Sequence, residues 1–452
     1  MSSRKRPIGA AVALAVAALL SAAPAIADTA ANAAFPSTYQ PRPSVLTAIT
    51  NATILTGTGS QIERGTVVMD QGRIIAIGAD VSVPANARII DAGGSYVTPG
   101  LIDAHSHLGV MPGPRTAAHQ DVNENVNPNT AEVWAEHSVW PQDAAFDRAR
   151  AGGVTTMMIL PGSSNLFGGR SVVLRNVDAS TTQAMKYPDS PYGLKMACGE
   201  NPKLRYGSRG RSPATRMGNV AGYRRGWIEA QDYARRAQGA NAPRRDLANE
   251  TLAAALAGDI SVQIHCYRAD EMAQMIDVAK EFDYKITAFH HAVEAYKIAD
   301  LLAANDICVA TWANRWGFKM EAADGIEENA AILTDAGVCV AIHSDEVHII
   351  QRLNLEASAA LAAGRRMGIE ISDAEAIKWI TSNPARIIGL ADDIGTLEQG
   401  KRADVVLWNT NPFSVYALPQ QVFMDGALVY DRADPASHQT NDFELGQSGA
   451  SQ

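Results

Sequence analysis

The sequence predicts an α/β fold made of a (β/α)₈ TIM-like barrel and a small composite β-sandwich. Residues 99–393 alternate short apolar runs with helix-like segments, which is the pattern of parallel βα units. Short β-like runs separated by Gly, Asp and Asn turns fill residues 44–98 and return in 394–430. Because these two β-rich segments flank the alternating region, we expect them to form one domain into which the barrel is inserted.

Composition excludes several classes of protein. The chain has 452 residues, of which 46% are hydrophobic and 19% charged, as in an ordinary globular protein with a large core. The formal charge of −9 comes without a basic patch, so we expect no nucleic-acid partner. A small molecule is the expected partner.

The N-terminus has the pattern of a secretory signal peptide. A basic segment, 4–6, precedes an apolar run, 8–20, and Ala25 and Ala27 satisfy the small-x-small cleavage rule. Residues 1–27 are therefore expected to be removed on export to the periplasm or medium. The run is short for a span of about 20 residues, so no stable membrane anchor is expected. Residues 28–43 are predicted to be a linker, and 431–452 a polar tail.

Four cysteines occur inside or beside apolar runs: Cys198, Cys266, Cys308 and Cys339. An exported protein can form disulfides, but isolated cysteines in such runs favour small buried thiols. The sequence contains no C-x-x-C pair, which argues against a thiolate zinc site.

Metal-binding side chains follow the apolar runs in a fixed order. They are His105, His107, His265, His290 or His291, and Asp345. The carboxyl ends of barrel strands meet at one face, and residues two apart on a strand share a side, so these groups should converge. Imidazole and carboxylate ligands indicate a divalent metal, most simply zinc, with one or two ions. We favour His291 over His290 because it leads directly into the next helix.

Asp345 can serve as a metal ligand and as the general base and acid, whereas His343 and His348 are read as surrounding groups. Two residues could bridge a second ion. Glu200 is favoured because it lies just past an apolar run, and Lys195, which would have to be carbamylated, is the alternative.

Substrate-binding candidates lie close to these strand ends. Tyr267 and Arg268 directly follow the His265 strand. Tyr206 belongs to a basic stretch, 201–225, that we interpret as a loop able to hold a substrate carboxylate.

The chain resembles the amidohydrolase superfamily, in the branch that holds imidazolonepropionases, metal-dependent dipeptidases and prolidases. The resemblance covers about residues 44–430, and its motifs lie at 97–107, 151–156, 291–296, 344–345, 381–385 and 395–404. It implies the barrel with a composite β-sandwich, zinc or a similar ion, hydrolysis of an amide-type bond, and a possible homo-oligomer.

Two positions depart from the patterns of relatives. Many dipeptidase relatives bridge two ions with a carbamylated lysine, whereas Glu200 stands near the expected place here. Deaminase relatives have an acid three residues after the fifth-strand histidine, and that position is Arg268. We therefore rank a deaminase, or a lactone or phosphotriester hydrolase, below a hydrolase of small peptides or cyclic amides. A scaffold without catalysis ranks last, because it would usually have lost ligands.

Overall fold

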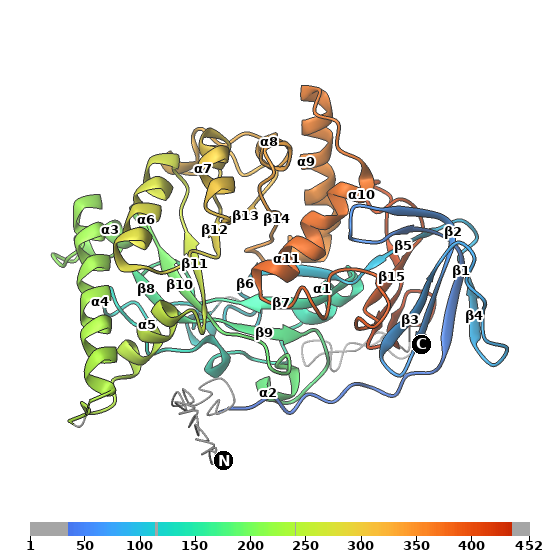
Figure 1. Cartoon of the computed structure of the whole chain (residues 1–452), viewed down its shortest axis with the longest axis horizontal. Coiled ribbons are helices and arrows are strands. Elements are labelled where there is room, and N and C mark those ends of the chain that lie inside the picture. Colours follow the sequence, from blue (N-terminus) through green and yellow to red (C-terminus); the bar gives the residue numbers. More distant parts are fainter. Residues whose placement is uncertain (1–34, 114–115, 240, 436–452) are drawn as a thin grey trace, which may run out of the picture.

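The computed structural model describes residues 35–113, 116–239 and 241–435 (Figure 1). The predicted signal peptide and most of the predicted polar tail lie outside these residues. Within them, no helix is both long and apolar enough to cross a membrane.

Strands from both ends of the chain share one eight-stranded sheet, on the right of Figure 1. Its members are β1 (Thr47–Leu55), β2 (Gln61–Asp70), β3 (Arg73–Gly78), β4 (Arg88–Asp91), β5 (Tyr96–Pro99), β15 (Val405–Trp408), β16 (Pro419–Met424) and β17 (Ala427–Asp431). The order is β17-β16-β15-β5-β1-β2-β3, with β4 beside β1. The antiparallel β5–β15 pair joins the two chain ends, with Thr98 opposite Val406.

The middle of the chain builds two further sheets. One contains β6 (Leu101–Ser106), β7 (Val154–Ile159) and β9 (Val172–Arg175), and the other contains β8 (Phe167–Arg170), β10 (Gly193–Ala197), β11 (Ser261–His265), β12 (Ala288–His290), β13 (Cys308–Thr311) and β14 (Val340–Ile342). Strands β10 to β14 are parallel neighbours in chain order. Their residues are almost all buried, as expected when helices cover a parallel sheet.

Helices follow most of these strands. They are α1 (Ala145–Ala151), α2 (Thr182–Met185), α3 (Glu200–Gly207), α4 (Arg216–Ala237), α5 (Leu247–Ala257), α6 (Ala269–Phe282), α7 (Ala299–Ala304), α8 (Asn329–Asp335), α9 (Leu353–Met367), α10 (Asp373–Ala376) and α11 (Ser382–Ile387). The backbone N–H of Asp345 donates to the carbonyl of His105 at 2.9 Å, so the end of β14 meets the end of β6. Two pairings, β7–β9 and β8–β10, are antiparallel and depart from a purely parallel arrangement.

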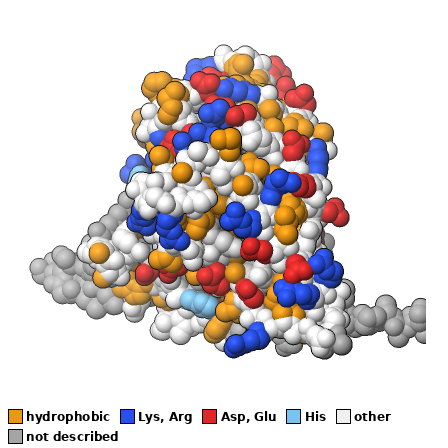
Figure 2. All heavy atoms as spheres, turned by 90° about the vertical axis from the view of Figure 1, so that its left-hand side faces the viewer, with side chains coloured by type: hydrophobic (Ala, Val, Ile, Leu, Met, Phe, Trp, Pro, Cys, Tyr) orange, Lys and Arg blue, Asp and Glu red, His pale blue; other side chains and the backbone are white. Residues whose placement is uncertain are grey.

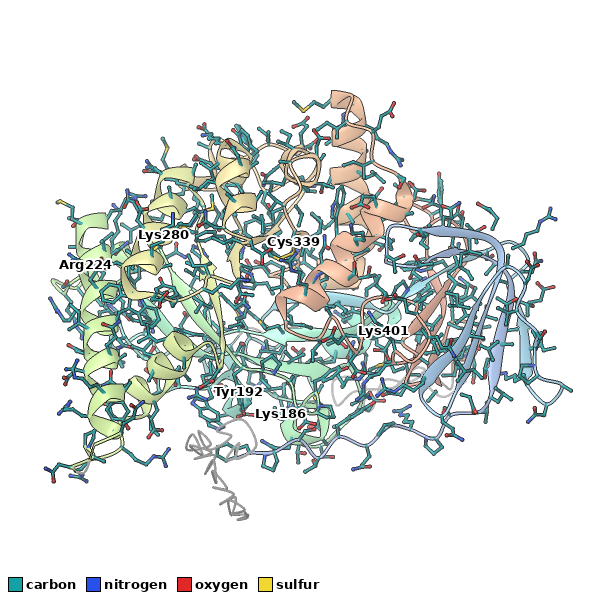
Figure 3. The ribbon with its side chains drawn as sticks, in the orientation of Figure 1. Lys186, Tyr192, Arg224, Lys280, Cys339 and Lys401 are labelled. Atoms are coloured by element: carbon teal, nitrogen blue, oxygen red, sulfur yellow. A yellow bond between two sulfur atoms is a disulfide. The ribbon has the colours of Figure 1, made fainter. Side chains whose placement is uncertain are left out.

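The sequence suggested that the basic stretch 201–225 is a loop, but most of it is helical and only 208–215 connect two helices. The stretch contains all but the first residue of α3 and the first half of α4, where the Thr215 hydroxyl caps the helix by accepting from the N–H of Gly218 at 3.0 Å. Tyr223, Trp227 and Ala230 are buried at helical spacing, which the many intervening arginines masked. Arg224 lies on the outer side of α4, where its guanidinium pairs with Glu281 (Figure 3). On this face, basic and acidic side chains are interspersed (Figure 2).

The four cysteines form two disulfides, Cys198–Cys266 and Cys308–Cys339, so the expectation of free thiols was wrong. Strand register explains both bonds. Ala197 pairs with His265, which places the next residues of β10 and β11 side by side, and Val309 pairs with Val340, which does the same for the residues before them. The partners are separated by 68 and 31 residues, so only the sheet reveals their proximity.

A buried arginine ties the parts of the molecule together. Arg175 at the end of β9 is fully buried, and its Nη2 donates to Asp404 at 2.7 Å and to Asp425 at 3.0 Å. Asp404 precedes β15 and Asp425 lies in the turn between β16 and β17. The hydroxyl of Tyr39, in the N-terminal segment, also donates to Asp425. Opposite charges and shared hydrogen bonds offset the cost of burying these groups.

Replacing Arg175 with Met should lower the free energy of unfolding by about 3–5 kcal/mol, because buried Asp404 would lose its cation and Asp425 would keep only Arg402. Urea denaturation followed by fluorescence measures this. Arg225 is exposed on α4 and serves as the matched control, since Arg225→Met should change stability by less than about 0.5 kcal/mol. A loss below about 1 kcal/mol in Arg175→Met would contradict the assigned role.

The disulfides predict a simple thiol count. Denatured, unreduced protein should show no reactive thiol, and reduction should release four. Removing either bond should cost about 2–5 kcal/mol of stability. Reaction with a thiol-reactive dye measures the number of free thiols. Denaturation of variants in which both cysteines of one pair are replaced by Ser measures the loss of stability. Reactive thiols before reduction would contradict the assignment.

Candidate metal centre

The first group of metal-binding side chains joins β6 to the end of β14. Asp345 Oδ1 lies 3.1 Å from His107 Nε2 and 3.4 Å from His105 Nε2. Nδ1 of His107 lies 2.8 Å from the carbonyl oxygen of Leu160, which orients the ring. Ligand atoms of these three residues lie within 4.8 Å of one another, an arrangement able to hold a metal ion.

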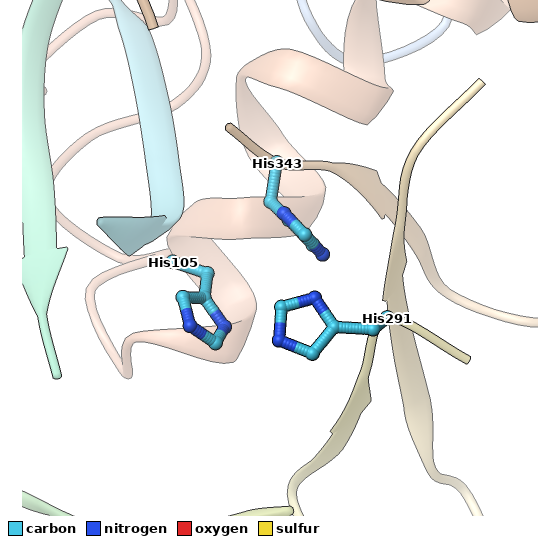
Figure 4. Close-up of side chains that lie close together, drawn as sticks. All are labelled: His105, His291 and His343. Carbon is cyan, nitrogen blue, oxygen red and sulfur yellow. The ribbon is translucent and has the colours of Figure 1, made fainter. Parts of the chain in front are cut away.

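A second group shares His105 and adds His291 and His343 (Figure 4). The ring centroids are 4.5 Å apart for His105–His291, 5.1 Å for His105–His343 and 4.7 Å for His291–His343. Sequence reasoning had placed His343 around the site rather than in it. The structure places the His343 ring directly against the rings of His105 and His291. The signal that the sequence offered for His343 was its position two residues before Asp345.

His290 and His291 point to different places. Strand alternation turns Phe289 into the hydrophobic core and His290 to the opposite side, where its Nδ1 lies 2.9 Å from His105 Nδ1 and its Nε2 lies 2.7 Å from Gln263 Oε1. His291 has a left-handed backbone, with φ of 64°. This conformation carries its ring into the second metal-binding group.

Lys195 and Glu200 are also separated. Lys195 is fully buried on β10, with Nζ 3.4 Å from His105 Nε2 and 3.0 Å from the carbonyl oxygen of Pro161. Burial lowers its pKa to about 7, against the raising effect of Asp345. Glu200 begins α3, and its Oε1 lies 3.5 Å from Lys319 Nζ. Of these two residues, only Lys195 contacts the histidines.

The remaining predicted ligand, His265, lies beside the second group. Its ring centroid is 4.7 Å from that of His291, and its Nε2 lies 3.3 Å from Asn201 Nδ2. Neither of the two three-residue groups includes it.

The three predicted substrate-binding residues have different surroundings. Tyr267 is buried and its ring stacks on His291, with centroids 5.7 Å apart. Arg268 pairs with Asp270 at 2.9 Å and is 41% exposed. The hydroxyl of Tyr206 is bonded within the scaffold, to the carbonyl of Asn127 and to Asn165. Of the three, only Tyr267 therefore contacts the second group, His105, His291 and His343, which we call the histidine cluster.

Electrostatics prepares the site for a cation. Burial lowers the pKa of His343 to about 3 and holds the pKa values of His105, His265 and His291 well below the usual range, so the imidazoles are neutral. Burial raises the pKa of Asp345, but the hydrogen bond and charge of His107 outweigh it and the net shift is downward. Neutral imidazole and ionised carboxylate are the forms that bind metal.

Unpartnered nitrogens give an independent test of fit. Nδ1 of His265, Nδ1 of His291 and both ring nitrogens of His343 are buried without a hydrogen-bond partner. Buried polar atoms normally have hydrogen-bond partners. These unpartnered nitrogens are therefore suited to bind a divalent ion that takes nitrogen and oxygen ligands.

Comparisons with known proteins identify the family of the chain. The Amidohydrolase family model matches residues 96–432. The protein named Amidohydrolase tasK of Hapsidospora irregularis is 32% identical over 81% of this chain, which spans 40% of that relative's length. An imidazolonepropionase of Legionella pneumophila is 24% identical, covering 84% of this chain and 98% of that one. A 5-methylthioadenosine/S-adenosylhomocysteine deaminase of Moorella thermoacetica is 24% identical over 79% and 84% of the two chains.

Solved structures add a further match. The crystal structure of an amidohydrolase from Thermotoga maritima MSB8 superimposes with a TM-score of 0.79 at 34% identity, covering 85% of this chain and all of the other. The superfamily has a TIM-barrel fold and depends on metal. With the family model matching most of the sequence, the chain belongs to the amidohydrolase family and is a hydrolytic enzyme.

Proposed function

We propose that this protein is an exported, metal-dependent hydrolase of carbon–nitrogen bonds in small peptides or cyclic amides. The observation that carries the proposal is the contact of Asp345 with His105 and His107, because it sets a carboxylate beside metal-binding imidazoles. Export is proposed from the signal pattern in residues 1–27. The closed barrel, the β-sandwich domain and a homo-oligomer belong to the same proposal.

Zinc is the proposed metal. His105, His107 and Asp345 would hold one ion, and His265 and His291 would contribute to a second. A divalent ion supplies Lewis acidity and lowers the pKa of the water that it binds to about 7. His343 lies against both His105 and His291 and would restrict how those rings turn.

The bridging group in this proposal is Lys195 rather than Glu200. Its Nζ already contacts His105, and a neutral buried amine can add to carbon dioxide, forming an N–C bond and releasing one proton. The resulting carbamate would offer two oxygens. Glu200 is instead held toward Lys319, and α3 carries it past the strand end.

Asp345 moves the protons in the proposed reaction. Its ionised carboxylate accepts a proton from the attacking water and then delivers it to the leaving nitrogen, which departs as a neutral amine. Tyr267, which stacks on His291, bounds the space in which the substrate lies. A deaminase is the second candidate because relatives bear that name. It would need another acid, since Arg268 occupies the relevant position and is paired with Asp270.

Replacing Asp345 with Asn should reduce kcat/KM for a hydrolysed dipeptide or lactam by about 10²–10⁴-fold, because the proton acceptor is lost. Steady-state assays on metal-loaded protein, with circular dichroism as a folding check, measure this. His348→Asn is the control, since His348 is 65% exposed. Near-normal activity in Asp345→Asn would overturn the assignment, and ammonia release without peptide cleavage would favour the deaminase.

Metal content should separate the two bridging candidates. We expect two ions per wild-type chain, one or none in Lys195→Ala, and two in Glu200→Ala. Elemental analysis gives the count, and intact mass under non-denaturing conditions reports one added carbon dioxide in wild type only. Loss of metal in Glu200→Ala with retention in Lys195→Ala would reverse the assignment.

A further inference from the structure

A cation without an acidic partner lies close to the histidine cluster. Arg315 follows β13, and its Cζ is 5.5 Å from the ring centroid of Trp312. Trp312 in turn stacks on His291, with centroids 4.4 Å apart, and lies 4.9 Å from His343. Among the residues that the structure describes, no carboxylate lies within ion-pair distance of Arg315. Glu356 on α9 acts on it only at longer range.

The other cation of this loop is already balanced. Lys319 Nζ lies 3.5 Å from both Glu200 Oε1 and Glu321 Oε2, and donates to Asn201 Oδ1 at 3.1 Å. These contacts tie the loop to the start of α3. Lys319 therefore serves the structure, and Arg315 is the cation of this loop left available to a ligand.

Aromatic rings border the same space. The centroids of Tyr267, Trp312 and Phe318 lie 6.1 Å from one another in each pair. Tyr267 and Trp312 are buried, whereas Phe318 is 54% exposed, so the three rings lead from the cluster to solvent. Lys319 Nζ lies over the Tyr267 ring, 3.9 Å from its centroid, and the remaining surface of the three rings can pack on an apolar or cyclic substituent.

We infer that Arg315 is a specificity-determining residue that binds a substrate carboxylate, while the aromatic trio Tyr267, Trp312 and Phe318 receives an apolar group beside it. The planar guanidinium suits a carboxylate because it donates two parallel hydrogen bonds. Its position over the Trp312 ring, with Cζ 5.5 Å from the centroid, restricts its orientation. This inference rests on the proposed function and narrows its substrates to those carrying a free carboxylate near the cleaved carbon–nitrogen bond.

Matched substrates test the inference. Dipeptides ending in phenylalanine or proline are assayed as free acids and as their C-terminal amides. Metal-loaded wild type should prefer the acid by about 10- to 100-fold in kcat/KM, the range of a charge-assisted pair. Arg315→Gln should lose that preference, mainly through KM for the acid, while the amide changes by less than about twofold. Arg315→Lys should restore part of it, since charge returns without the bidentate geometry.

Two controls make the outcomes separable. Arg225→Gln, on the exposed face of α4, should retain the wild-type preference. Calorimetric titration with phenylalanine and phenylalaninamide reports binding without turnover, and only the acid should bind wild type more tightly than Arg315→Gln. Equal use of acid and amide by wild type, or a preference unchanged in Arg315→Gln, would overturn the inference and leave the hydrolase standing. If no substrate is cleaved, the proposed function fails, and the titration alone decides the role of Arg315.

Discussion

A single buried carboxylate holds the two halves of the candidate site together. Asp103 Oδ1 accepts from the backbone N–H of His105 at 3.0 Å and of Ser344 at 3.2 Å, and its Oδ2 accepts from the Ser344 hydroxyl. These bonds join the end of β6 to the end of β14. The contact between Asp345 and the two histidines depends on that join and on the hydrogen bond from the Asp345 N–H to the His105 carbonyl, because the residues lie more than 200 positions apart in the chain.

The candidate site contains residues with a strained backbone and buried polar atoms without hydrogen-bond partners. His291 and Asp345 both have positive φ, which L-residues rarely adopt and which costs about 1–3 kcal/mol each. Several imidazole nitrogens are buried without partners. A bound cation would satisfy a nitrogen of His265 and of His291, so metal binding and stability should be linked. The surrounding scaffold must hold the strained geometry, and the Cys198–Cys266 disulfide beside His265 contributes to that support.

Specificity resides in a different part of the fold. The strands deliver the histidines and Asp345, whereas Trp312, Arg315 and Phe318 come from the segment that follows β13. Its conformation depends on Lys319 contacting α3 and on Trp316 Nε1 donating to the carbonyl of Ala323 at 2.8 Å. Loops of this kind can change substrate while the metal-binding frame is retained.

The sequence by itself determined the α/β class and the family and named most of the candidate metal ligands, because these depend on local periodicity and on motifs at strand ends. His105, His107, His291 and Asp345 were named in this way, and the structure groups His105 with His107 and Asp345 on one side and with His291 on the other.

Tertiary structure decided what depends on neighbours distant in the chain. Strand alternation turns Lys195 away from Leu194 and Met196, toward His105, and the backbone turn at His291 separates it from His290. Register pairs the cysteines, and packing makes a helix of residues read as a basic loop. The sequence also does not show that Arg315 lacks a carboxylate partner. That follows from the fold, which places Glu200 and Glu321 against Lys319 and no carboxylate of the described residues within ion-pair distance of Arg315.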